Sequence, residues 1–180
     1  PLVARRPGLR SPGMVDGTEA LVRAIVGQQV SVSGARTVLG RIVERLGTPL
    51  AEPSESITHT FPTAHDLGTA HDDALPMPAK RKEALRESCR RVARGDIAVD
   101  AGTDRDGLRR GLVAIPGIGP WTAEYVAMRA LGDPDAYPAT DIALINALGR
   151  KGETLEHLKP WRAYAAIRLW RRVAKKGIQT

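Results

Sequence analysis

The sequence predicts an all-α protein. Apolar residues recur at helical spacing along nearly all of the 180 residues, and no segment alternates cleanly between apolar and polar residues as a half-buried strand would. Residues that start and end helices divide this pattern into segments of ordinary helix length. A chain of this length can bury a hydrophobic core without disulfides or a metal ion.

The first two helices are marked by their caps. Asp16-Gly-Thr-Glu19 is a capping box that predicts the start of a helix, and residues 27–30 interrupt it. Ser31 caps a second helix, which carries its apolar residues on one side and ends at Gly47. Because residues 48–62 contain three prolines, we expect them to form a loop.

The middle of the chain predicts three further helices. Thr63 caps a short one, and a long basic helix follows over residues 79–94 after two prolines. Asp104 or Asp106 begins the next helix, which ends near residues 115–117.

The last third predicts helices at 119–131 and 139–148, separated by the Pro-rich residues 132–138. Pro160 stands at the start of a final long helix. We expect an extension at 1–15, a helical half at 16–132 whose hairpin covers 105–131, and a second half at 133–180.

The chain is basic, with 27 Lys and Arg against 20 Asp and Glu and a formal charge of +7. A basic globular domain attracts polyanions, of which nucleic acid is the commonest, although solubility alone would also explain the charge. The basic residues of the predicted helix 79–94 form either a solvated face or a DNA-facing patch. They are Lys80, Arg81, Lys82, Arg86, Arg90, Arg91 and Arg94.

Cysteine usage excludes two kinds of site. Cys89 is the single cysteine, so the chain cannot form an internal disulfide or hold an iron–sulfur cluster, which needs about four thiolates. We expect Cys89 to be a buried packing residue. Low cysteine content fits a reducing cytoplasm.

Several other classes are excluded by sequence pattern. No apolar run approaches the roughly 20 residues that span a bilayer, so we expect no membrane partner. Residues 1–15 carry arginines without a hydrophobic segment behind them and are not a signal peptide. No Walker-type nucleotide-binding loop or dinucleotide fingerprint occurs, so we expect no cofactor. Since the chain starts at Pro1, we expect it to be a segment of a longer protein.

The sharpest local signal is the segment Leu112-Val-Ala-Ile-Pro-Gly-Ile-Gly-Pro-Trp-Thr-Ala123, in which a glycine turn joins two apolar helices. Gly117 can adopt positive φ, and Gly119 lets an anion approach the backbone closely. The amides after it lie at a helix N-terminus, where the dipole favours an anion. Such a turn grips a DNA phosphate without reading sequence, whereas an ordinary helical hairpin would bind nothing.

This hairpin resembles that of the helix-hairpin-helix superfamily of DNA glycosylases. The resemblance extends to four segments in the right order over most of the chain, which are similar to the bacterial inducible 3-methyladenine DNA glycosylase II (AlkA type). They are Arg6-Pro-Gly-Leu-Arg10, Val22-Arg-Ala-Ile-Val-Gly-Gln-Gln-Val-Ser31, Ile115–Ala123 and Lys159-Pro-Trp-Arg-Ala-Tyr164. It implies two helical halves around a cleft, a monomer, and double-stranded DNA with damaged bases as the partner. It also implies a bacterial cytoplasmic protein associated with the nucleoid.

The resemblance also implies roles for single residues. Asp141 is the expected catalytic acid, and the base pocket is expected to contain Trp121, Tyr125, Gln28 and Trp170. The expected phosphate-binding residues are Gly117, Gly119 and Thr122. No catalytic metal is expected, although the backbone of Ile115 and Ile118 is a candidate site for a monovalent cation.

The chemistry gives these assignments a physical reason. Breaking an N-glycosidic bond produces an oxocarbenium-like sugar, which a fixed carboxylate stabilises while it orients or deprotonates the attacking water. Without the hairpin upstream, Asp141 would be read as a helix-initial acid that satisfies the dipole. Trp121 and Tyr125 share one helix face, and an electron-rich pocket suits cationic alkylated purines; the alternative is that these aromatic rings fill the core.

One feature distinguishes this chain from lyase-competent relatives, and two depart from the AlkA-type family. Relatives with lyase activity carry a lysine two residues after Gly119, where this chain has Trp121, which implies a monofunctional enzyme. The apolar residue that the family inserts into DNA falls on Gln29, which is a poorer wedge but can hydrogen-bond an orphaned base. The family's N-terminal α/β domain is missing from this chain.

The function predicted is hydrolysis of alkylated bases from DNA, by base flipping, in base excision repair. Two alternatives remain open on the sequence: a non-catalytic DNA-binding hairpin module, and a related glycosylase that acts on deaminated or mismatched bases.

Overall fold

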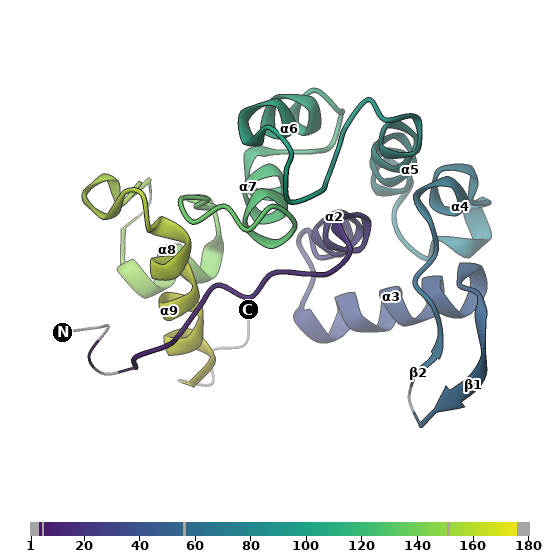
Figure 1. The fold of residues 1–180 in the computed structure, drawn as a ribbon, viewed down its shortest axis with the longest axis horizontal. Coiled ribbons are helices and arrows are strands. Elements are labelled where there is room, and N and C mark those ends of the chain that lie inside the picture. Colours follow the sequence, from purple (N-terminus) through teal and green to yellow (C-terminus); the bar gives the residue numbers. More distant parts are fainter. Residues whose placement is uncertain (1–3, 5, 56, 151, 176–180) are drawn as a thin grey trace.

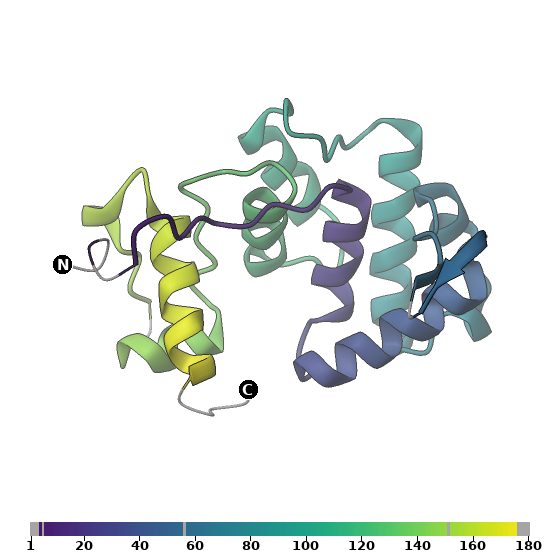
Figure 2. The same ribbon diagram turned by 60° about the horizontal axis from the view of Figure 1, so that its bottom comes forward.

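The computed structural model describes residues 4, 6–55, 57–150 and 152–175, and it is mostly helical, as predicted. Figures 1 and 2 show two groups of helices: α8 (Ile142–Leu148) and α9 (Arg162–Lys175) lie together at one end, and α2 to α7 form the larger group. The N-terminal segment runs from beside the small group to α2 in both views. Among the described helices, none has the length and apolar character needed to cross a bilayer.

Helix α2 (Gly17–Val26) is the centre of the larger group. It packs against α3 (Val32–Leu46), α5 (Ala79–Arg94) and α7 (Pro120–Arg129). Its buried residues, all apolar, are Ala20, Leu21, Val22, Ala24, Ile25 and Val26. A helix that is apolar on nearly every side has to be covered by neighbours, and this composition explains its central place.

The caps of the first helices follow the sequence with one correction. Asp16 accepts a hydrogen bond from the Glu19 amide, but the Glu19 carboxylate binds Arg23 instead of returning to the cap, so only half of the predicted capping box forms. Ser31 caps α3 by accepting from the Gly34 amide, as predicted.

Residues 48–62, predicted as a loop, contain a short antiparallel hairpin instead. Its strands are β1 (Pro49–Ser54) and β2 (Ile57–His59). No residue of either strand is fully buried, so neither strand needs the alternation of apolar and polar residues that marks a half-buried strand. The prediction failed here because the hairpin lies outside the core.

Helix α5 is anchored by a charged side chain. It follows α4 (Ala64–Thr69), which starts with the predicted Thr63 capping box, and the short helix η1 (Asp72–Ala74). The buried Arg86 guanidinium binds Asp72 and Glu83, and its Nε donates to the Ala70 carbonyl at 2.9 Å. Hydrogen bonds from Arg86 and Lys82 hold the pKa of the Asp72 carboxyl below its ordinary value.

Two helix starts are settled by the structure. Asp104 caps α6 (Arg105–Val113) by accepting the amides of Asp106 and Gly107, so Asp106 lies inside the helix. Helix α9 begins at Arg162 rather than at Pro160, after the short helix η2 (Glu156–Leu158).

Cys89 is fully buried, as predicted, and burial raises the pKa of its thiol from 9.0 to about 12. We expect the native protein at pH 8 to react with a thiol-specific disulfide reagent only at the rate of its unfolding, and the urea-unfolded protein to react at once. Because the folded pKa is the higher one, this thiol's contribution to stability is complete below about pH 9 and is lost as the pH rises towards 12. Rapid labelling of the native chain would contradict this burial.

Candidate functional site

The predicted hairpin is formed by α6, α7 and the turn between them. Gly117 has φ of 89°, in the left-handed region, and a Cβ there would lie 3.2 Å from the Ala84 Cβ on α5. The turn therefore rests against α5. Gly119 is the N-cap of α7, and a Cβ added to it would meet no atom within 4 Å, so the space over Gly119 is open to an incoming group.

The start of α7 offers backbone donors to that space. Pro120 occupies the first helical position and has no N–H, and the amides of Trp121 and Thr122 have no partner within the helix. The Thr122 side chain is buried, and its hydroxyl accepts a hydrogen bond from Gln28 Nε2 at 2.9 Å. The predicted phosphate contact of Thr122 stays a prediction, and the backbone N–H is the group left to make it.

Gln28 lies at the other side of the turn, just after α2. Its Nε2 donates to the Gly117 carbonyl at 3.2 Å as well as to Thr122, so its amide joins the end of α2 to the hairpin. The assignment of Gln28 to the base pocket stays a prediction. Because Nε2 is bound to the hairpin, the side-chain carbonyl oxygen is the group that could contact a base.

Asp141 is held by three uncharged N–H groups. It is the N-cap of α8 and its Oδ1 accepts the Leu144 amide at 3.0 Å and the Trp170 indole N–H at 2.9 Å. Its Oδ2 accepts the Trp121 indole N–H at 2.9 Å. Asp141 therefore caps α8 and at the same time lies among the predicted site residues. Since these donors are neutral, they orient its charge without cancelling it.

The predicted aromatic residues gather around this carboxylate. Trp121 and Tyr125 stack on one another, with ring centroids 5.2 Å apart and planes at 17°, and the Trp170 ring lies 6.3 Å from Tyr125. All three are partly buried. Because Trp121 and Tyr125 are stacked, they form one wall together and do not face each other across a gap. Trp161 lies apart, 58% exposed.

Two further predicted features lie at the edges of the site. Gln29 is exposed between α2 and α3 and has φ of 55°, a conformation that a non-glycine residue adopts at a cost of about 1–2 kcal/mol. The Ile115 carbonyl already accepts the Ile118 amide at 3.0 Å within the turn. The wedge role of Gln29 and the cation site of Ile115 and Ile118 both stay predictions.

The connection from α7 to Asp141 is fixed by an ion network. Arg109 on α6 makes two hydrogen bonds to Glu124 on α7, at 2.7 and 3.0 Å, and one to the buried Asp133 at 2.7 Å. Glu124 also accepts the Tyr137 amide at 3.0 Å. Burial alone would lower the pKa of Arg109, but its hydrogen bonds to Glu124 and Asp133 outweigh burial and raise it.

A second ion pair fixes the same connection to α9. Arg162 makes two hydrogen bonds to Asp135, at 2.8 and 2.7 Å, and the Ala163 amide donates to the Pro134 carbonyl at 2.9 Å. These hydrogen bonds hold the pKa of Asp135 below its ordinary value. Helix α7 thus contacts Asp141 through Trp121 and the segment before Asp141 through Glu124. Helix α9 does the same through Trp170 and Arg162.

This arrangement can be set beside known proteins. No protein-family model matches the chain. It is 39% identical over 178 residues to the probable bifunctional transcriptional activator/DNA repair enzyme AlkA of Mycobacterium tuberculosis, and these cover 94% of this chain and 36% of that protein. It is 36% identical to DNA-3-methyladenine glycosylase 2 of Escherichia coli, with 94% and 62% covered. The Schizosaccharomyces pombe 3-methyladenine DNA glycosylase Mag1, solved in complex with abasic DNA, superposes with a TM-score of 0.76 at 23% identity, with 96% and 88% covered.

The chain has the helix-hairpin-helix DNA glycosylase fold. It is homologous to the AlkA-type glycosylases, and it spans about a third of the mycobacterial relative and less than two thirds of the Escherichia coli one. In this glycosylase fold α6 and α7 form the hairpin. The aromatic residues and Asp141 come from α7, α8 and α9, which are separate in the sequence and meet at the Asp141 carboxylate.

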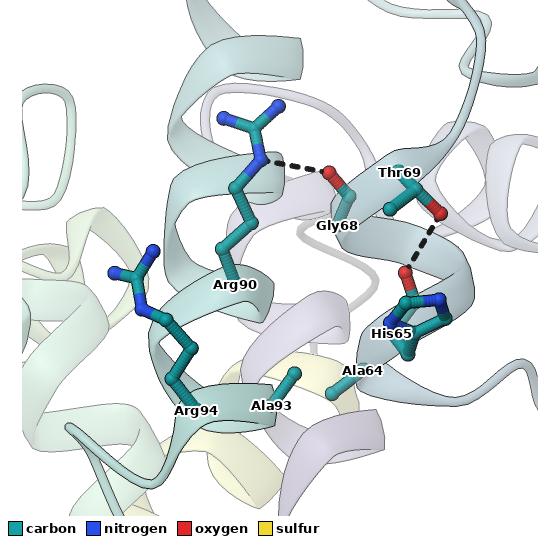
Figure 3. A pocket seen from close by; sticks show the side chains of 7 residues that line it. All are labelled: Ala64, His65, Gly68, Thr69, Arg90, Ala93 and Arg94. Carbon is teal, nitrogen blue, oxygen red and sulfur yellow. Dashed lines mark hydrogen bonds between the residues drawn. The ribbon is translucent and has the colours of Figure 1, made fainter.

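The ion networks of this glycosylase fold were missed by sequence reasoning. Asp133 and Asp135 lie in the Pro-rich segment 132–138, whose pattern indicates no ion pair. Arg109 carries no signal because its partners lie far along the chain. Arg162 belongs to the segment Lys159–Tyr164 that carried the resemblance, and that segment was the available clue. The surface hollow of Figure 3, between α4 and α5, contains no predicted site residue; its lining is Ala64, His65, Gly68, Thr69, Arg90, Ala93 and Arg94.

Proposed function

We propose that the chain is the catalytic part of a monofunctional DNA glycosylase that hydrolyses the N-glycosidic bond of alkylated bases of the 3-methyladenine type. The observation that carries the proposal is the Asp141 carboxylate, fixed between the indoles of Trp121 and Trp170. The names of the homologous AlkA and 3-methyladenine glycosylases support the substrate class.

Duplex DNA is the proposed partner. The open space over Gly119, with the Trp121 and Thr122 amides beneath it, suits a backbone phosphate, because unpaired amides at a helix N-terminus attract anions. Gln29 stands exposed on the neighbouring loop, where its amide would fill the space left by a flipped base and hydrogen-bond the unpaired partner.

The proposed reaction needs one carboxylate. An alkylated purine is already cationic, so it leaves as a neutral base without a strong general acid. The electron pair of the breaking bond goes to the base, and the Asp141 charge stabilises the oxocarbenium-like sugar that remains. Water then attacks the anomeric carbon, with Asp141 orienting it or taking its proton.

The aromatic wall suits the same substrates. A cationic base is attracted to the face of an indole or phenol ring, and the paired Trp121 and Tyr125 rings present such a face beside Asp141. Because Trp121 stands where lyase-competent relatives carry lysine, no amine is available there for a Schiff base, and the abasic site is left intact.

The test is release of bases from duplex DNA treated with a methylating agent. We expect the chain to free N-methylated purines and to leave abasic sites that are cleaved only after alkali is added. A matched duplex carrying uracil or hypoxanthine serves as the comparison for deaminated bases. Strand cleavage without alkali would contradict the monofunctional assignment, and preferential release of the deaminated base would contradict the substrate class.

A further inference from the structure

The basic residues of α5 separate into two classes when their partners are compared. Five of them hold carboxylates or backbone carbonyls: Lys82, Arg86, Arg90, Arg91 and Arg94. Among the described residues, Lys80 and Arg81 pair with no acid. Most basic side chains of α5 therefore bind other groups of the protein, whereas the two at its N-terminal end do not pair with an acid in the described part of the chain.

This unpaired end lies at the hairpin turn. A Cβ on Gly117 would be 3.2 Å from the Ala84 side chain and 3.9 Å from the Lys80 carbonyl oxygen. Lys80 and Ala84 are four residues apart and share one helix face, so Lys80 starts from the side of α5 that meets the turn. Lys80 is exposed, as are Pro116 and Gly117 beside it.

The place of these cations in the helix is unfavourable without an external anion. Lys80 and Arg81 stand in the first turn of α5, where the helix dipole is positive, and no acidic residue accompanies them there. Positive side chains at this end destabilise a helix, and an anion bound beside them offsets that repulsion. A polyanion bound at the adjacent turn supplies that charge.

We propose that Lys80, with Arg81 beside it, is a second DNA-backbone contact of this protein and binds a phosphate next to the one held at the Gly119 turn. This rests on the proposed function, because the same duplex has to occupy both places. A lysine is suited to the task, since its ammonium is a point charge on a flexible stem that reaches a phosphate without fixed geometry. The contact carries no base specificity.

The test is the salt dependence of binding to a short duplex with one abasic site, measured by fluorescence anisotropy. Each phosphate contact contributes a slope of about −0.9 to the plot of log affinity against log salt. We expect Lys80→Gln to make the slope shallower by about 0.9, and Lys80→Arg to retain the wild-type slope. Arg94→Gln is the control, because it removes the same charge from the far end of the same helix, where Arg94 binds Asp96 at 2.9 Å.

The outcomes separate this contact from the proposed function. Equal slopes for wild type, Lys80→Gln and Arg94→Gln would overturn the Lys80 contact, and so would equal losses in the two variants. A wild-type chain that binds no duplex and releases no base would overturn the proposed function as well.

Discussion

Replacing Asp141 with Asn is expected to lower the rate of base release by about 10²–10⁴-fold, while affinity for an abasic duplex stays close to that of wild type. The substitution removes the negative charge that we propose stabilises the sugar cation, and it retains the shape of the side chain. The measurement is single-turnover release of methylated purines with excess protein, together with anisotropy on the abasic duplex. Base release at the wild-type rate would remove Asp141 from the reaction.

The geometry of Asp141 supplies a control for that experiment. One carboxamide oxygen can still accept the Leu144 amide and the Trp170 indole, but the amide nitrogen would then face the Trp121 indole N–H, donor against donor. Trp121→Phe with Asp141 intact removes this donor and keeps the carboxylate charge. A kinetic defect of Asp141→Asn far larger than that of Trp121→Phe would locate the effect in the charge.

Replacing Asp133 with Ala is expected to destabilise the fold by about 3 kcal/mol, because it removes one partner from a buried ion network. Asp133 is 4% exposed, binds Arg109 at 2.7 Å and accepts the Asp135 amide at 2.9 Å. For a chain of this size that loss corresponds to a fall in Tm of roughly 6–12 °C. The measurement is thermal unfolding followed by circular dichroism.

Asp106→Ala is the matched control for this prediction. Asp106 contacts the same Arg109 guanidinium at 3.7 Å, but its side chain is 79% exposed. Exposed ion pairs contribute little, so its loss should leave the Tm nearly unchanged. Equal losses in the two variants would show that burial of Asp133 does not govern the strength of the network.

The parts of the fold that depend on local sequence could be predicted. Caps are interactions over three residues, which is why Ser31 and Thr63 predicted helix starts correctly. The glycine turn was predictable for the same reason, since positive φ at Gly117 is a property of one residue. The hairpin after α3 was not, because its exposed strands leave no periodic pattern.

The residues of the candidate site could be predicted from the sequence, but the contacts between them could not. Resemblance placed Trp121, Tyr125 and Trp170 with Asp141. The donation of both indoles to the two oxygens of one carboxylate follows only from the three-dimensional structure. The segment before Asp141 reads as a flexible linker because proline and glycine are turn residues. Its rigidity comes from arginines that lie far from it in sequence, and a single sequence contains no signal that pairs them.

The two indoles that meet at Asp141 also make the protein its own optical reporter. Indole emission depends on the hydrogen bonds and exposure of the ring, and the indole N–H groups of Trp121 and Trp170 both donate to the Asp141 carboxylate. Trp161, the third tryptophan, stands on the surface, and Trp161→Phe would leave only the two that belong to the site. The intrinsic fluorescence of that variant would register the arrival of a base, or any separation of α7 from α9, without a label on protein or DNA.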